Sequence, residues 1–163
     1  MGAGLWVAPR AALAATVERR LSFLHTHTNE HLSIAYASLG AYRPEALSRI
    51  DRLLRDFRTG DIHAIDPALL DLLSDLAALA GTREPFHVIS GYRTPKTNQM
   101  LRRRSEGVAS HSLHMDGRAI DIRLPDVPLR QLREAAVALG RGGVGYYPGS
   151  DFVHVDTGRV RTW

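Results

Sequence analysis

The apolar residues of this chain recur with two different periods, and each period predicts its own kind of element. Segments 21–26 and 32–36 are rich in β-prone residues and are separated by a polar stretch, which predicts an N-terminal hairpin. Behind Pro44, apolar residues recur at helical spacing as far as Phe57, and a glycine follows at position 60. This spacing predicts a helix over residues 44–58.

The segment that follows has the pattern of a mostly buried helix. Asp66 suits an N-cap and Pro67 the first helical position, and leucine-rich sequence continues until Gly81. The remainder of the chain alternates short apolar runs with runs of helical spacing. These patterns predict strands at 86–89, 119–124, 143–147 and 152–155, a helix that begins at Thr94-Pro95, and a helix over 127–139.

Length and composition limit the domain organisation. The 163 residues correspond to one domain of ordinary size, and 44% apolar with 23% charged residues excludes a disordered or a membrane-spanning chain. The order of the elements predicts a single-domain α+β fold over residues 20–163, in which helices flank a small central antiparallel sheet. We expect this unit to be a monomer.

Residues 1–19 are expected to form a separate arm. They contain an apolar run rich in small residues, which resembles the remnant of an export signal, although Pro9 and Arg10 interrupt it. A disordered arm is the alternative. We therefore expect an exported protein of the periplasm or cell envelope, and the lack of any long apolar stretch predicts that it has no transmembrane segment.

The net charge is +4, and three consecutive arginines stand at positions 102–104. A basic surface favours polyanions such as nucleic acid, anionic lipid or an anionic cell-wall polymer, whereas a solvated helix face is the simpler interpretation. No nucleic-acid-binding motif accompanies the cluster, so we expect no nucleic-acid partner.

The candidate chemistry begins from the absence of cysteine, which excludes disulfides, thiolate metal sites and a cysteine nucleophile. A metal site must therefore use His, Asp or Glu. His114 and Asp121 lie seven residues apart, with Gly117 between them to permit close approach of the backbone. Asp121 falls within an apolar strand, where an unpaired carboxylate is costly, so it requires a cation, a positive side chain or several hydrogen bonds.

A second imidazole comes from a later strand. His154 lies in an apolar run whose period-two alternation places it on the same face as Asp156. Together, His114, Asp121 and His154 can supply three ligands to Zn²⁺ and leave the fourth tetrahedral position for water. Three protein ligands with one open position is the pattern of a catalytic zinc site.

Residues 112–121 carry the pattern SxHxxGxAxD, which resembles the signature of the zinc D-alanyl-D-alanine peptidases, a family that includes VanX-type dipeptidases and murein endopeptidases. Segments 90–94 and 142–148 resemble the murein endopeptidase branch in particular. The resemblance implies an α+β fold and zinc bound by His114, Asp121 and His154. It also implies hydrolysis of a peptide cross-link or another D-amino-acid peptide bond of the bacterial cell wall, and it leaves both endopeptidase and carboxypeptidase action open.

The same resemblance implies roles around the metal. Arg93 matches the arginine that binds the scissile carbonyl, and a fixed guanidinium there would stabilise an oxyanion, although a salt bridge to a nearby acid is the alternative. The general base in the family stands three residues before the last zinc histidine, which is Asp151 here. Asp156 competes for this role, or else supports the zinc site by accepting a hydrogen bond. A third option is His111.

The mechanism that follows is zinc-assisted hydrolysis, in which an aspartate removes a proton from water and returns it to the leaving amine. Two other classes of function stay open at this point. One is a non-catalytic cell-wall-binding module that keeps the zinc fold. The other is a metal-free structural or nucleic-acid-binding domain in which the His and Asp residues only satisfy one another.

Overall fold

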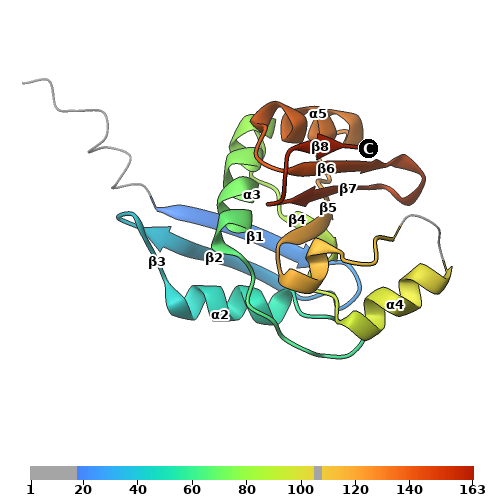
Figure 1. The fold of residues 1–163 in the computed structure, drawn as a ribbon. Coiled ribbons are helices and arrows are strands. Elements are labelled where there is room, and N and C mark those ends of the chain that lie inside the picture. Colours follow the sequence, from blue (N-terminus) through green and yellow to red (C-terminus); the bar gives the residue numbers. More distant parts are fainter. Residues whose placement is uncertain (1–17, 105–107) are drawn as a thin grey trace, which may run out of the picture.

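One eight-stranded sheet organises residues 18–104 and 108–163, the parts of the chain that the computed structural model describes (Figure 1). Its strand order is β3-β2-β1-β4-β5-β7-β6-β8. The strands are β1 (Arg19–His25), β2 (His31–Ser38), β3 (Ala41–Tyr42), β4 (Phe86–Ser90), β5 (Ala119–Arg123), β6 (Gly143–Tyr147), β7 (Phe152–Asp156) and β8 (Arg161–Thr162). The helices are α2 (Pro44–Leu53), α3 (Pro67–Ala80), α4 (Pro95–Arg104) and α5 (Leu129–Leu139), and two short 3-10 turns are η1 (Leu113–Asp116) and η2 (Pro148–Ser150).

The predicted α+β class is confirmed, but the sheet is larger than expected and is mixed rather than antiparallel. β1 runs parallel to β4, and β6 runs parallel to β8. The edge strands β3 and β8 have two residues each, too few for a periodic pattern to predict them. β4 returns to the sheet only after α2 and α3, and this long connection allows the parallel pairing with β1.

The first helix is shorter than the predicted span of 44–58. It ends at Leu53, and Asp56 then forms a turn in which its side chain accepts a hydrogen bond from the backbone N–H of Arg58 (3.0 Å). The same carboxylate accepts from the backbone and hydroxyl of Thr94, at 2.9 and 2.8 Å. An aspartate that bonds locally in this way competes with helix continuation.

The second helix agrees closely with its prediction. Asp66 caps α3 by accepting from the backbone N–H of Ala68, and Gly81 ends it in the left-handed conformation. Five of its leucines join the hydrophobic core (Leu69, Leu70, Leu72, Leu73 and Leu76), whereas Leu79 is exposed near the end of the helix. α3 packs against both β1 and α5. α5 in turn packs on β6 and β7.

The paired strands β5 and β7 turn one face toward the hydrophobic core and carry the candidate ligands on the other. Ile120 and Ile122 of β5 belong to the hydrophobic core together with Val153 and Val155 of β7. Because side chains alternate along a strand, the residues between them point to the other face. The register pairs Asp121 directly with His154, so a carboxylate and an imidazole face the same side at neighbouring positions.

The predicted arm falls almost wholly outside the described residues. Arg19, which was assigned to it, already belongs to β1. Among the helices of the described segments, none is both long and apolar enough to cross a membrane.

Candidate metal centre

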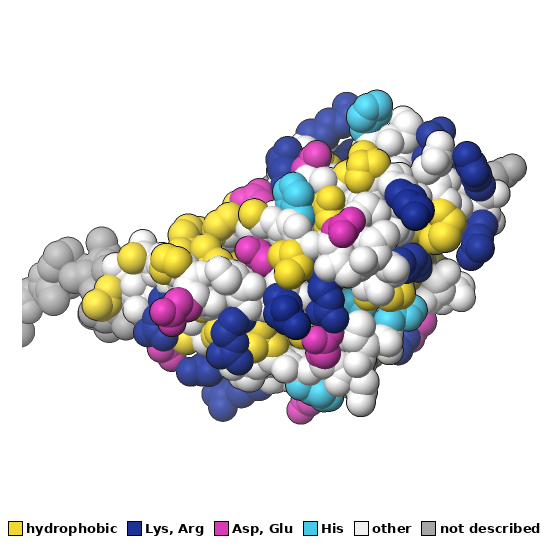
Figure 2. Space-filling view, turned by 90° about the horizontal axis from the view of Figure 1, so that it is seen from below, with side chains coloured by type: hydrophobic (Ala, Val, Ile, Leu, Met, Phe, Trp, Pro, Cys, Tyr) yellow, Lys and Arg dark blue, Asp and Glu magenta, His cyan; other side chains and the backbone are white. Residues whose placement is uncertain are grey.

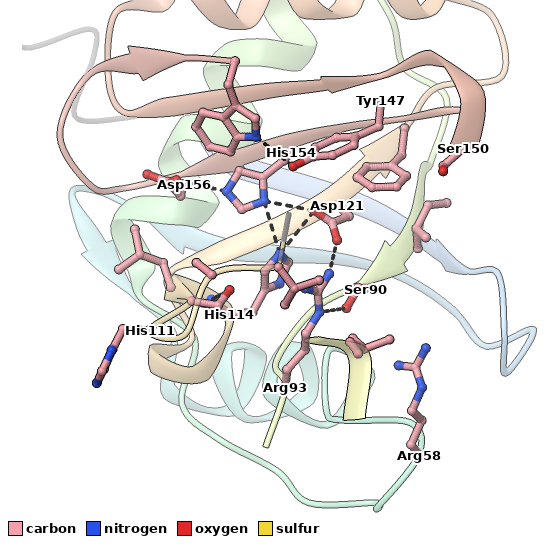
Figure 3. A pocket seen from close by; sticks show the side chains of 18 of the residues that line it. Arg58, Ser90, Arg93, His111, His114, Asp121, Tyr147, Ser150, His154 and Asp156 are labelled. Carbon is pink, nitrogen blue, oxygen red and sulfur yellow. Dashed lines mark hydrogen bonds and ion pairs between the residues drawn. The ribbon is translucent and has the colours of Figure 1, made fainter. Parts of the chain in front are cut away.

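Three side chains from separate elements converge on one point at the floor of a pocket (Figure 3). Nε2 of His114 lies 3.2 Å from Oδ1 of Asp121 and 3.2 Å from Nδ1 of His154, and the latter two atoms are 3.0 Å apart. All three residues are buried. The structure therefore brings together the residues predicted as ligands, although they stand up to 40 positions apart in the chain.

Local structure fixes His114 in this arrangement. Ser112 caps η1, and its hydroxyl accepts from the backbone N–H of His114. Gly117 ends the turn with φ +65°, and a Cβ at that position would lie 2.2 Å from the carbonyl oxygen of Ala64. Only glycine permits both this backbone conformation and this close approach. The turn then leads directly into β5, which carries Asp121.

Hydrogen bonds on the outer side of each imidazole determine which nitrogen faces the cluster. Nδ1 of His114 must donate to the carbonyl oxygen of Gly91 (2.7 Å), because that oxygen can only accept. Nε2 of His154 lies 3.0 Å from Oδ2 of Asp156 and donates to it. In the neutral state that metal binding requires, each ring therefore turns an acceptor nitrogen toward the inward oxygen of Asp121, which is itself an acceptor.

Three acceptors in contact are unfavourable unless a proton or a metal cation lies between them. Ligand atoms about 2.0–2.2 Å from a tetrahedral zinc ion are about 3.3–3.6 Å from one another, slightly more than the separations of 3.0–3.2 Å found here. The donor set of two imidazoles and a carboxylate also suits zinc. The residues present thus fit a zinc ion bound by His114, Asp121 and His154.

The electrostatics of the cluster follow from burial and from these contacts. Burial would raise the pKa of Asp121, but His114 and Arg93 hold it well below its usual range. Burial lowers the pKa of His114 to about 4, so this ring is neutral and able to act as a ligand at neutral pH. Burial also acts to lower the pKa of His154, yet the carboxylates of Asp121 and Asp156 raise it, because the protonated ring donates to both; a metal ion at the cluster would take the place of the proton on Nδ1.

Arg93 adopts the ion pair that was one of its two predicted roles. Its Nη2 donates to the outer oxygen of Asp121, and its Nε donates to the hydroxyl of Ser90 (2.8 Å). Its side chain is only 13% exposed. Nη1 has no hydrogen-bond partner among the residues that the structure describes, and the side chain lines the pocket beside the cluster. The guanidinium can therefore hold Asp121 and still contact a bound molecule.

The two candidate bases lie in different surroundings. Asp156 is fully buried behind His154, where its carboxylate also accepts from Arg161 and from two backbone N–H groups. This position corresponds to the predicted supporting role. Asp151 is exposed and pairs with Arg123 (2.8 Å), so the structure does not bring it to the cluster. It ends η2 with φ +54°, and its side chain lines a second pocket with Arg123 instead.

The pocket around the cluster has a volume of about 600 Å³. Its lining includes His111, the third candidate base, which is exposed at this site. Sequence reasoning missed the roles of Ser90, which holds Arg93, and of Arg161, which pairs with Asp156. Ser90 was detectable from its place three residues before Arg93 at a strand end, whereas no sequence pattern pointed to Arg161.

Fold and site together define an α+β domain with a buried His-Asp-His cluster that could hold a metal ion. The family model for peptidase family M15 described as "Peptidoglycan L,D-endopeptidase MepK" matches residues 13–163. The peptidoglycan L,D-endopeptidase MepK of Escherichia coli (strain K12) is 42% identical over 164 residues, covering 100% of this chain and 90% of the relative. The probable peptidoglycan L,D-endopeptidase MepK of Haemophilus influenzae (strain ATCC 51907 / DSM 11121 / KW20 / Rd) is also 42% identical, covering 98% and 88%.

The chain belongs to this family of peptidases. Membership confirms the resemblance to the zinc D-alanyl-D-alanine peptidases, and with it the prediction of a hydrolytic enzyme.

Proposed function

We propose that this protein is a zinc-dependent peptidase of the cell envelope that hydrolyses peptide cross-links of bacterial peptidoglycan at bonds of the L,D type. The observation that carries the proposal is the convergence of three acceptor atoms, two imidazole nitrogens and one carboxylate oxygen, at the floor of a pocket large enough for a peptide. The names of the relatives support peptidoglycan as the substrate and the L,D bond as the point of cleavage.

His114, Asp121 and His154 would hold the zinc ion. Bound there, zinc supplies Lewis-acid chemistry, because it lowers the pKa of water and polarises a carbonyl group. The remaining steps fall to this chain's own side chains. Nη1 of Arg93 would hold the oxygen of the scissile carbonyl while that oxygen gains negative charge. The ion pair with Asp121 fixes the guanidinium in place for this role.

Proton transfer requires a carboxylate that water can reach. Asp156 is a poor candidate because it is fully buried and its oxygens already accept five hydrogen bonds. Asp151 is the better one, because it is exposed and directly follows Ser150, which lines the pocket. Its ion pair with Arg123 is of the exposed kind worth about 0–1 kcal/mol, so the side chain can leave Arg123 at little cost. We assign Asp151 as proton acceptor and Asp156 as the residue that orients His154.

A basic binding surface for nucleic acid has less support. Arg102, Arg103 and Arg104 are exposed at the end of α4, as a solvated helix face would be. On the face drawn in Figure 2, Lys and Arg side chains are spread over the whole surface, with several near its right-hand end, and acidic side chains lie among the others toward the centre and left.

The test combines metal content with digestion of purified peptidoglycan. Untagged protein prepared without added metal is analysed by elemental mass spectrometry, alongside His114→Ala and, as a matched control, His111→Ala. We expect near-stoichiometric zinc in the wild type and the control, and its loss in His114→Ala. Chelated protein should stop releasing L,D-cleaved muropeptides, and zinc should restore the release.

Two results would contradict the proposal. One is a wild-type protein that holds no zinc and cannot be loaded with it. The other is a zinc-loaded protein that binds peptidoglycan without cutting it, which would favour the non-catalytic wall-binding module.

A further inference from the structure

The indole of Trp163 covers part of the sheet next to the metal centre. The backbone of Trp163 continues the pairing of β8 with β6, accepting from the N–H of Tyr146 (3.0 Å) and donating to the carbonyl of Val144 (3.2 Å). Its ring lies over Gly145, where an added Cβ would be 2.7 Å from the indole Cε2. Gly145 therefore leaves the space that this ring occupies.

This indole touches two further residues that line the pocket. Its ring centre is 5.2 Å from that of His154, one of the three converging residues. On its polar edge, Nε1 donates to the hydroxyl oxygen of Tyr147 (2.7 Å). Figure 3 shows the Tyr147 hydroxyl beside the indole nitrogen, on the opposite side of the ligand cluster from Arg93.

The hydrogen bond from Trp163 decides what Tyr147 can offer. A phenol carries one hydrogen and two lone pairs, and an indole N–H can only donate. The phenol oxygen therefore accepts from Trp163, and its own hydrogen remains available. No acceptor for that hydrogen exists among the described residues, and the ring is fixed by stacking on Phe152, with centres 4.6 Å apart.

We propose that the Tyr147 hydroxyl donates a hydrogen bond to a carbonyl or carboxylate oxygen of the bound peptide, and that Trp163 is a positioning residue that aims it. This inference rests on the proposed function. The substrate would then be held from two sides, by the Arg93 guanidinium on one side of the ligand cluster and by the Tyr147 phenol on the other. In this arrangement Tyr147 would contact an oxygen other than that of the scissile carbonyl. Loss of the Tyr147 hydroxyl should therefore weaken substrate binding more than it slows the chemical step.

A double-mutant cycle tests the coupling. Tyr147→Phe removes the hydroxyl, and Trp163→Phe removes the indole N–H while keeping an aromatic ring over Gly145. We expect Tyr147→Phe to lower kcat/KM about tenfold, mainly through KM, and Trp163→Phe to lower it by a smaller factor. The double variant should be no slower than Tyr147→Phe alone, because Trp163 acts through that hydroxyl. Zinc content and thermal midpoint should stay at wild-type values in all three.

A second pair of variants separates positioning from general damage to the sheet. Gly145→Ala should displace the indole and lower kcat/KM as Trp163→Phe does. In a Trp163→Ala background, Gly145→Ala should cause little further loss, because the indole atoms nearest to its added methyl group are then absent.

Three outcomes would overturn the inference. The first is a double variant whose loss in kcat/KM equals the product of the two single losses. The second is wild-type kcat/KM in Trp163→Phe, and the third is a loss of bound zinc that accounts for the lower kcat/KM of the variants. Zinc-dependent activity of the wild type is measured in parallel. Its absence would refute the proposed function itself, so the two failures are distinguishable.

Discussion

Replacing Asp156 with asparagine should weaken zinc binding, because it should move the ring proton of His154 from Nε2 to Nδ1, the nitrogen that faces the cluster. Oδ1 of Asp156 accepts from the backbone N–H groups of Gly143 (3.0 Å) and Gly158 (2.8 Å), whereas Oδ2 accepts from His154 Nε2 (3.0 Å). An asparagine that keeps its oxygen toward the two backbone donors must turn its NH₂ toward His154. Nε2 then has to accept, so the ring proton moves to Nδ1, the nitrogen that faces the cluster.

The size of this effect follows from the contacts that change. Loss of an outer partner of a metal-ligating histidine typically reduces metal affinity by about 10–100-fold, or about 1.4–2.7 kcal/mol. Asp156 also pairs with Arg161 (2.8 Å), and removing the charge of a buried partner costs roughly 3–5 kcal/mol of folding stability. Arg161 is one-third exposed, so water can solvate part of its charge, and we expect the lower end of that range.

Competition with a chromophoric chelator measures the zinc affinity, and urea denaturation of the chelated protein measures stability separately. Asp156→Glu, which keeps the charge, serves as a control and should retain more affinity than Asp156→Asn. Wild-type zinc affinity in a folded Asp156→Asn protein would refute the argument that this carboxylate sets the tautomer of His154.

Three further predictions concern other parts of the chain. Asp151→Asn should leave zinc content unchanged but lower kcat by about 10²–10⁴-fold, the usual contribution of general base catalysis; an unchanged kcat for muropeptide release would exclude Asp151 as proton acceptor. Gly117→Ala should lower the free energy of unfolding of the chelated protein, measured by urea denaturation, by about 2 kcal/mol or more. The variant combines a left-handed backbone with a Cβ 2.2 Å from the carbonyl oxygen of Ala64. A loss of well under about 1 kcal/mol would contradict this. Burial and the nearby His27 lower the pKa of His25 to about 4 in the folded protein, whereas the unfolded chain protonates this ring near pH 6.5. Between these two pH values the unfolded state binds a proton that the folded state does not. The folded state therefore loses stability as the pH falls from about 6.5 toward 4. On acidification over this range, the free energy of unfolding should fall by up to about 3 kcal/mol more in the wild type than in His25→Phe. Parallel pH profiles of stability for the two proteins would argue against this role of His25.

Those parts of the fold that depend on local pattern were predictable from sequence. The cap at Asp66 with its following proline gave the start of α3 correctly, and period-two alternation in β5 and β7 placed Asp121 and His154 on one face. Their convergence with His114 was predictable because residue chemistry restricted the possible ligands. Two-residue strands such as β3 and β8 have no local signal, since they form only where a longer neighbour offers its edge.

Other features depend on partners far away in the chain. The end of α2 at Leu53 depends on Asp56, whose carboxylate bonds to Thr94, 38 residues later. Likewise, the direction of the Asp151 side chain, in the turn before β7, depends on Arg123 at the end of β5. The spacing of Asp151 from His154 is the same whichever way its side chain points, so sequence alone could not reveal that it lies outside the cluster.

The pairing of β5 with β7 also determines where this chain can gain or lose residues. Within either strand, a single inserted or deleted residue would turn Asp121 or His154 toward the leucine-rich core and bring an isoleucine or valine to the pocket. Length changes in the connection that contains α5 would leave this pairing intact. We therefore expect natural variation in length to fall between the two strands and not inside them, so that an alignment gap within either strand would mark a chain without the metal centre.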